Sequence, residues 1–305
     1  MNLLTLWALS LKLRGSPSLF YNNMINQIAI KKNISENPFI IMGIVNVTPD
    51  SFFDGGMHNS QEKALDYAEK MISEGADVLD FGGASSRPGA AEVAPEEEAL
   101  RVVPVIKKIA SLYSVPISID TTWSSVARAA IDAGATIVND ISAGRFDRRM
   151  AELVAETKCS VILMHSRKTP GTMQTDPFYQ DVVSEVKNEL LESVLLFIDK
   201  GVKREKILID PGIGFAKSVG HNIALLHKME EIVNTGYPVV LGTSRKNFIG
   251  KITGKEVQKR LGGSLGSIAS AYSKGVRIFR VHDVDATNDF LKVVSVIERG
   301  EEAST

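Results

Sequence analysis

Hydrophobic and polar positions divide the chain, from residue 39 onward, into two alternating kinds of segment. Short apolar runs rich in β-branched residues are followed by longer segments in which apolar residues recur every three or four positions. Runs that are apolar almost throughout are typical of parallel strands covered on both faces. The sequence therefore predicts eight strands, at residues 39–47, 78–81, 116–119, 136–141, 160–165, 206–209, 238–241 and 276–281.

The longer segments between these runs have the features of amphipathic helices. Residues 60–74 carry apolar side chains at helical spacing, and Pro95 followed by three glutamates is typical of a helix start. Gly134 stands where a helix would end. We expect helices at residues 60–74, from 95 onward, and at 124–133, 147–157, 179–200, 222–234, 261–273 and 285–298.

Eight strand–helix units in series predict an α/β protein with a closed parallel (βα)8 barrel. We expect one barrel domain over residues 39–299, an N-terminal extension at 1–38 and a tail at 300–305. A doubly wound open sheet is the alternative. That fold normally has one dominant phosphate-binding turn, whereas here polar residues follow nearly every predicted strand.

The N-terminal extension has a charge pattern of its own. Residues 1–35 contain no acidic residue, and their basic residues follow the apolar segment 3–11, which is the reverse of the order in a secretory signal peptide. An organellar transit peptide and a translation start at Met24 are two alternatives. We interpret the extension as a disordered or non-native leader.

Composition excludes several classes of function. Lys and Arg total 35 against 36 Asp and Glu, so a net charge of −1 argues against a nucleic-acid partner. No apolar run reaches the roughly 18 residues of a membrane span, which argues against a membrane protein. The single cysteine, Cys159, cannot form an internal disulfide and lies in an apolar run, so we expect a buried residue and a reducing, cytoplasmic compartment.

Active sites of (βα)8 barrels lie on the residues that follow the strands. The polar residues at those positions are Asn46 with the loop 48–56, the loop 82–89, Asp120 and Thr121, Asn139 and Asp140, His165, the loop 210–215, the segment 243–246, and Arg280, His282 and Asp283. Any one of them has a structural alternative: Asp120 could cap a helix, Lys246 could be a surface cation, and His165 is as readily structural as functional. Their convergence on one rim favours an active site.

The chemistry of the rim separates into two groups. Asp120, Asn139 and Asp210 suit a flat heterocycle with an amino-pyrimidinone edge, because a carboxylate can accept two adjacent N–H groups. The second group, which suits a phosphate or diphosphate, consists of Asn46, Ser86, Arg280 and His282. The chain has no Cys/His cluster for zinc, whereas Mg²⁺ prefers oxygen ligands and bridges to phosphates, so Asn46 is the expected protein ligand of Mg²⁺.

Seven motifs along residues 39–298 resemble the dihydropteroate synthase family. The longest is MGIVNVTPDSF at residues 42–52, which resembles the opening motif of that family. The others, in chain order, are SRPG at 86–89, IDT at 119–121, NDI at 139–141, DPG at 210–212, SRK at 244–246 and RVHD at 280–283. The resemblance implies a TIM barrel that joins 6-hydroxymethyl-7,8-dihydropterin diphosphate to 4-aminobenzoate and releases diphosphate.

The resemblance also implies roles for individual residues. The pterin would be held by Asp120, Asn139, Asp210 and Lys246, and the diphosphate by Arg280, His282 and Asn46 with Mg²⁺ on Asn46. Ser86 and Ser244 would lie near the aminobenzoate, and Arg87 and Phe215 would also bind substrate. Asp120, Lys246 and Arg280 would be catalytic. The family expectation for assembly is a homodimer.

The expected mechanism is early cleavage of the C–O bond to diphosphate, giving a pterin cation that the amine then attacks. Ala84 stands where many family members have Glu, and Ser86 where Thr is usual, and both differences bear on the amine site and on sulfonamide sensitivity. Three alternatives use the same barrel: a pterin- or folate-dependent methyltransferase, an aldolase with Lys246 as Schiff base, and a non-catalytic paralogue.

Overall fold

The computed structural model describes residues 38–48, 56–84, 93–167 and 177–300, with the side chains of residues 56–60 left aside. Eight strands pair in parallel in the order β6-β5-β4-β3-β2-β1-β8-β7. The backbone N–H of Ile209 donates to Pro238 O at 3.0 Å and joins β6 to the segment before β7, which closes the sheet. The strands are β1 (Ile40–Asn46), β2 (Val78–Gly82), β3 (Ile117–Asp120), β4 (Ile137–Asp140), β5 (Ser160–Met164), β6 (Ile207–Asp210), β7 (Val240–Leu241) and β8 (Ile278–Val281).

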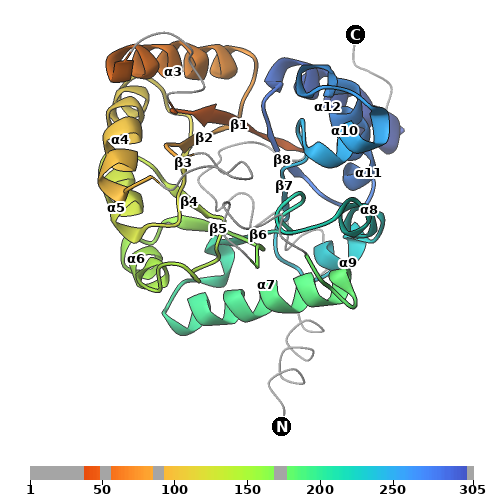
Figure 1. Cartoon of the computed structure of the whole chain (residues 1–305). Helices are drawn as coiled ribbons and strands as arrows, with labels where there is room; N and C mark the ends of the chain where they lie inside the picture. The colour runs from red at the N-terminus through yellow and green to blue at the C-terminus, as the bar shows by residue number, and fades with distance from the viewer. Residues whose placement is uncertain (1–37, 49–55, 85–92, 168–176, 301–305) are drawn as a thin grey trace.

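Helices form a ring around this barrel, which Figure 1 shows viewed along its axis. They are α3 (Gly56–Ser73), α4 (Pro95–Leu112), α5 (Ser124–Asp132), α6 (Arg149–Thr157), α7 (Val182–Asp199), α8 (Val219–His227), α9 (Met229–Val233), α10 (Asn247–Thr253), α11 (Leu261–Tyr272) and α12 (Val284–Arg299), with 3-10 turns η2 (Arg204–Lys206) and η3 (Val257–Lys259). The predicted (βα)8 barrel is confirmed, and so are all eight predicted strands.

Three helical regions differ from the sequence prediction. The helix expected at 222–234 is two helices, α8 and α9, because the backbone leaves the helical region at Lys228. The helix expected from 179 begins at Val182, because the side chain of Asp181 caps it by accepting from the backbone N–H groups of Val183 and Ser184. The short helix α10 after β7 was not predicted, although Lys246 at its start is part of the predicted rim.

Side chains on the strands alternate between two environments. Those that point outward pack against the helices in one large core, which includes the buried Cys159 as predicted. Those that point inward form an apolar layer near the starts of the strands, made of Ile40, Met42, Val78, Ile137, Ile162, Leu208, Val240 and Ile278. Two residues further along several strands, the inward position is charged or polar, so the barrel interior changes from an apolar floor to a polar rim.

Parts of three predictions lie outside the described residues. The N-terminal extension 1–38 and the tail 300–305 are described only at residues 38 and 300. Ser86, expected near the aminobenzoate, and the expected substrate-binding residue Arg87 also fall outside them. None of the helices in the described part of the chain is long and apolar enough to span a membrane.

Candidate active site

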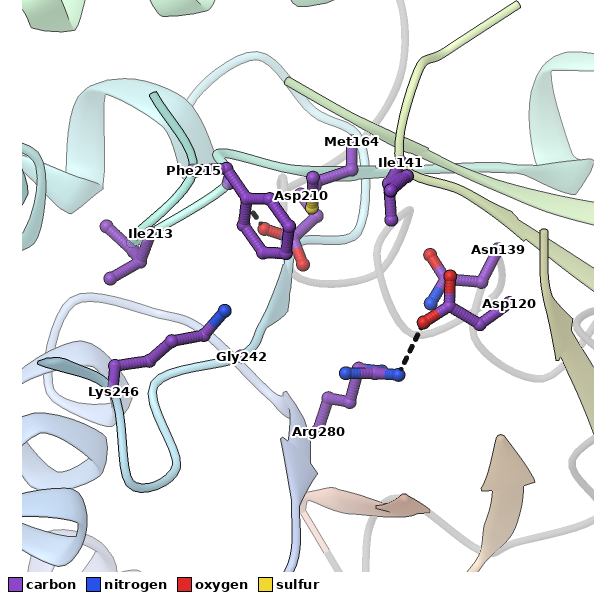
Figure 2. Close-up of a pocket in the computed structure, with 11 residues that line it drawn as sticks. Asp120, Asn139, Ile141, Met164, Asp210, Ile213, Phe215, Gly242, Lys246 and Arg280 are labelled. Carbon is purple, nitrogen blue, oxygen red and sulfur yellow. Dashed lines mark hydrogen bonds and ion pairs between the residues drawn. The ribbon is translucent and has the colours of Figure 1, made fainter. Parts of the chain in front are cut away.

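A pocket of about 300 Å³ opens at the carboxyl ends of the strands. Figure 2 shows Asp120, Asp210, Lys246 and Arg280 pointing into it from different elements. Its lining consists of Asp120, Asn139, Ile141, Met164, Asp210, Gly212, Ile213, Phe215, Gly242, Lys246 and Arg280. The structure therefore brings together the four residues predicted for the pterin, Asp120, Asn139, Asp210 and Lys246, and the predicted substrate-binding residue Phe215 lies with them.

Arg280 of β8 is held between two carboxylates on one side of this pocket. Its Nε donates to Asp80 Oδ2 at 2.6 Å, and its Nη2 donates to Asp120 Oδ2 at 2.7 Å. Asn139 Nδ2 donates to the same Oδ2 of Asp80 at 3.1 Å. One buried aspartate on β2 thus fixes side chains from β4 and β8, which orients both toward the pocket.

Asp80 was not predicted as a site residue. The residues predicted for the rim follow the strands, whereas Asp80 lies within β2 and is fully buried. A signal was present, because an ionisable residue in the apolar run 78–81 needs a charged or hydrogen-bonding partner. Its inward position follows from the alternation Val78, Asp80, Gly82, which places it above the apolar floor.

Burial changes the proton affinities of these groups in opposite directions. Burial raises the pKa of Asp120 to about 7, with the charge of Asp80 acting in the same direction and that of Arg280 opposing it. Burial alone would lower the pKa of Arg280, but the carboxylates of Asp80 and Asp120 outweigh it and raise that pKa. Arg280 is therefore a permanent cation, whereas Asp120 can change charge near neutral pH.

Asp210, Phe215 and Lys246 form the opposite side of the pocket. Asp210 Oδ1 accepts from the backbone N–H of Gly212 at 2.7 Å, and burial raises the pKa of this carboxyl. The ammonium of Lys246 lies 4.0 Å from the centre of the Phe215 ring, a cation–π distance. Burial and the charge of Arg280 lower the pKa of Lys246 to about 8. Lys246 faces the pocket, so the surface-cation alternative is wrong.

Ser244 and His282 meet at the edge of the pocket where β7 and β8 end. The backbone N–H of His282 donates to Ser244 Oγ at 3.2 Å, and His282 Nδ1 lies 3.1 Å from the same oxygen. A hydroxyl that accepts the backbone N–H can donate its own hydrogen to Nδ1, which leaves Nε2–H as a donor. Burial and the charge of Arg280 lower the pKa of His282 to about 3, so the ring is neutral at neutral pH.

Arg245 separates Ser244 from Lys246 and has a left-handed backbone, with φ of +57°. Its guanidinium pairs with Asp283, and its backbone N–H donates to Ser264 Oγ at 2.9 Å. These contacts hold a conformation that a non-glycine residue rarely adopts, as often occurs at functional sites. Lys246 consequently reaches the pocket while Ser244 contacts His282.

Asn46 ends β1, beside Gly82 at the end of β2. Within the described ranges, no group of three or more His, Cys, Asp or Glu residues could hold a metal ion. The amide oxygen of Asn46 is the kind of ligand that Mg²⁺ takes together with substrate and water oxygens.

The chain matches the family described as "Pterin binding enzyme" over residues 42–282. It is 44% identical to the dihydropteroate synthase of Bacillus subtilis over 245 residues, which are 80% of this chain and 84% of the relative. It is also 44% identical to the dihydropteroate synthase of Escherichia coli over 254 residues, 83% of this chain and 90% of the relative.

Solved structures give the same result. A Xanthomonas albilineans dihydropteroate synthase with 4-aminobenzoic acid superposes with a TM-score of 0.80 at 43% identity, over 85% of this chain and 93% of that chain. The enzyme of the same species in complex with 7,8-dihydropteroate has a TM-score of 0.78 at 40% identity, over the same shares of both chains. A Yersinia pestis dihydropteroate synthase with a sulfonamide drug complex has a TM-score of 0.81 at 38% identity, over 85% and 94%.

Proposed function

Since this chain belongs to the pterin binding enzyme family, we propose how its own residues carry out the dihydropteroate synthase reaction. The chain functions as a dihydropteroate synthase, a transferase that joins 6-hydroxymethyl-7,8-dihydropterin diphosphate to 4-aminobenzoate and releases diphosphate. The methyltransferase alternative shares the barrel and the pterin, but the relatives at 44% identity decide against it. The observation that carries the assignment of roles is the convergence of Asp120, Asn139, Asp210 and Lys246 on one pocket.

The pterin ring occupies this pocket with its polar edge toward Asp210 and Asn139. A carboxylate and an amide together supply the acceptors and the donor that an amino-pyrimidinone edge requires. Phe215, Met164 and Ile141 supply apolar surface for the faces of the ring. Lys246 donates to the remaining ring acceptors, and its position over Phe215 keeps its ammonium close to the ring.

The diphosphate leaves past the ends of β1 and β8. Early cleavage of the C–O bond sends its electron pair to the ester oxygen, which becomes a terminal oxygen of the released diphosphate, and Arg280 stabilises the new charge. His282 contributes by donating a hydrogen bond from a neutral ring, since its depressed pKa keeps it uncharged. The carboxylates of Asp120 and Asp210 stabilise the methylene cation conjugated with the pterin, and the aminobenzoate amine attacks it and then loses a proton.

The donor set at the end of β1 fits the expected Mg²⁺. Asn46 would hold the ion together with substrate oxygens and water, as Mg²⁺ prefers. When bound, Mg²⁺ would supply positive charge that neutralises the diphosphate.

A homodimer is the assembly that we propose. An apolar groove between α8, α10 and α11 supports it, because an exposed apolar patch of this kind commonly marks a protein interface. Its lining includes Ile223, Leu226, Phe248, Ile249 and Ile252, and 60% of Ile252 and 47% of Ile223 is exposed. A cytoplasmic location is likewise our proposal, supported by the single buried Cys159, which needs no oxidising compartment.

Diphosphate release tests the proposed roles directly. The unaltered chain is mixed with dihydropterin diphosphate and Mg²⁺, with and without 4-aminobenzoate, and Asp210→Asn is the matched variant because it keeps shape and removes charge. We expect Asp210→Asn to abolish turnover, and full activity in this variant would refute the pterin assignment. Rapid mixing tests the order of steps: early cleavage predicts a burst of diphosphate without aminobenzoate, and its complete absence would favour a concerted displacement.

A further inference from the structure

A fully buried lysine, Lys217, ends the loop that follows β6 and carries no role in the reaction described above. Its ammonium Nζ lies 3.0 Å from His165 Nδ1, 3.0 Å from Phe215 O and 3.3 Å from His165 O. Three acceptors match the three hydrogens of an ammonium group. Only 3% of Lys217 is exposed, so these contacts replace the water that the charge has lost.

The contacts of His165 show how the lysine is held in turn. His165 Nε2 lies 2.9 Å from Glu189 Oε2 on α7, and the ring is itself buried. Because Nδ1 accepts from Lys217, the ring hydrogen belongs on Nε2 and is donated to Glu189. Burial and the charge of Lys217 lower the pKa of His165 to about 4, which keeps the ring neutral. Glu189 also accepts from Arg167 Nε at 2.9 Å.

The loop held by this lysine has an unusual backbone. Gly212, Gly214 and Ala216 all have left-handed φ values, of +67°, +85° and +47°. A Cβ at Gly212 would lie 2.0 Å from His165 O, so the loop presses directly against the end of β5. The two glycines adopt these values without strain, whereas the backbone of Ala216 is strained and persists only where surrounding contacts fix it.

Two carbonyl groups of the loop are tied from outside it. Phe215 O accepts from Lys217, and Ala216 O accepts from the hydroxyl of Tyr179 at 3.1 Å. Arg167 lies over the Tyr179 ring at 4.1 Å, which joins this second tie to the same ion-pair cluster. Phe215, whose carbonyl is one of the two that are tied, lines the pocket with its side chain.

We propose that Lys217 is a positioning residue that holds Asp210 and Phe215 in the arrangement that binds the pterin. The inference rests on the proposed pterin site, since Asp210 begins the loop and Phe215 lines the pocket that would hold the pterin. Lys217 acts through hydrogen bonds to the backbone, which fix the loop, and through charge. Burial raises the pKa of Asp210, and the positive charge of Lys217 is among the influences that oppose this rise.

Opposing influences act on the pKa of Lys217 itself. Burial lowers its pKa to about 7, Asp210 and Glu189 raise it, and Arg145 and Arg167 lower it. Removing the ammonium would therefore both release the loop and leave the carboxylate of Asp210 less stabilised. Removing a lysine with a purely structural role would lower stability without releasing this loop or changing the stabilisation of Asp210.

The test compares Lys217→Met, which keeps chain length but removes charge and donors, with Lys108→Met on the exposed surface of α4. Binding of 6-hydroxymethylpterin is measured by calorimetry, and KM is measured for both substrates. We expect the pterin Kd of Lys217→Met to rise about tenfold or more, as loss of charged hydrogen bonds predicts. KM for 4-aminobenzoate should stay unchanged, and Lys108→Met should match the unaltered chain.

A pterin Kd that is unchanged in Lys217→Met would overturn the inference even if its melting temperature falls. Tyr179→Phe removes only the second tie, so it should weaken pterin binding in the same direction by a smaller factor. If Lys217→Met does not fold, Tyr179→Phe decides, and unaltered pterin binding in it would overturn the inference. Failure of the unaltered chain to bind pterin would instead refute the proposed function.

Discussion

The Nη2 atom of Arg280 lies 2.7 Å from Oδ2 of Asp120, so a residue assigned to the diphosphate contacts a residue assigned to the pterin. The pair spans the barrel interior between β8 and β3, and Asp80 accepts from a second nitrogen of the guanidinium, Nε. In the proposed function, the two halves of the substrate are therefore recognised by connected side chains. A change at one half should be felt at the other.

Asp80→Asn should impair catalysis although Asp80 does not line the pocket. The change removes the charge that holds Arg280 Nε and leaves a buried cation with Asp120 alone. We expect a loss of about 3 kcal/mol in the free energy of unfolding, as for other broken buried ion pairs. Loss of Arg280 orientation should lower kcat by about 100-fold, the scale of losing one charge-stabilising donor.

The measurements are denaturant unfolding and diphosphate release. Asp285→Asn, at the first turn of α12, is the control because it removes a carboxylate that lies outside the pocket lining. Normal kcat in Asp80→Asn would show that Arg280 keeps its position without this partner.

The architecture was predictable because the local signals agree with one another. All eight strands were found from apolar runs, and Asp120, Asn139 and Asp210 were found because barrel strand ends share one rim. Asp80 was missed because it lies inside a strand, where only the two-residue alternation marks it as inward-facing. Its partner Arg280 is 200 positions away in sequence, and no local pattern specifies that pairing.

Two further features are not predicted from the sequence, namely the role of Lys217 and the break between α8 and α9. Lys217 follows the predicted loop 210–215, and nothing near it in the sequence distinguishes it from a surface lysine. Its partner His165 is brought beside it only by the fold. The break between α8 and α9 at Lys228 is a matter of backbone geometry in a segment with continuous apolar spacing. Tertiary contacts, which sequence periodicity does not contain, decide the cases of Asp80 and Lys217.

Activity should depend on pH through Asp120 and Lys246. Asp120 must lose its proton to stabilise a cation, so kcat/KM for dihydropterin diphosphate should rise as pH increases through about 7. Lys246 must keep its proton to donate, so the same ratio should fall above about 8. Lys246→Arg, whose guanidinium stays protonated, should lose the alkaline fall, while Lys228→Arg on the surface should keep it. An unchanged alkaline limb in Lys246→Arg would exclude Lys246 as its origin.

Removal of divalent metal should stop turnover, because the diphosphate would then leave without a neutralising cation. We expect activity to vanish with a chelator and to return on addition of Mg²⁺. Asn46→Ala should raise the Mg²⁺ concentration needed for half-maximal activity, by about tenfold if one ligand is lost. Asn234→Ala, far from the rim at the end of α9, should leave that concentration unchanged. The same Mg²⁺ requirement in Asn46→Ala and the unaltered chain would remove Asn46 as a ligand.

Introducing charge into the groove between α8, α10 and α11 should separate the proposed dimer. Ile252→Glu places a carboxylate at a side chain that is 60% exposed, so burial against a second copy would become unfavourable. Light scattering should give a dimer mass for the unaltered chain and a monomer mass for the variant. Leu100→Glu, equally exposed on α4, is the control and should remain dimeric. A dimer that survives Ile252→Glu would place the interface on another face.

Gly212 and Gly254 offer a matched pair for testing the tight contact behind the pterin site. Their φ values are +67° and +68°, so alanine meets the same backbone strain at both, about 1–2 kcal/mol. A Cβ at Gly254 would meet nothing within 4 Å, whereas at Gly212 it would lie 2.0 Å from His165 O.

Gly254→Ala should therefore lower the free energy of unfolding by the strain alone and leave pterin binding unchanged. Gly212→Ala must in addition push the loop away from β5, because a backbone oxygen cannot yield as a flexible side chain could. We expect a loss beyond about 4 kcal/mol, the range of severe steric substitutions, together with loss of pterin affinity. Denaturant unfolding and pterin calorimetry measure the two effects. Equal losses of stability in the two variants would mean that the loop after β6 can move away from His165 at little cost. The close approach of Gly212 to His165 O would then not be what fixes the position of Asp210.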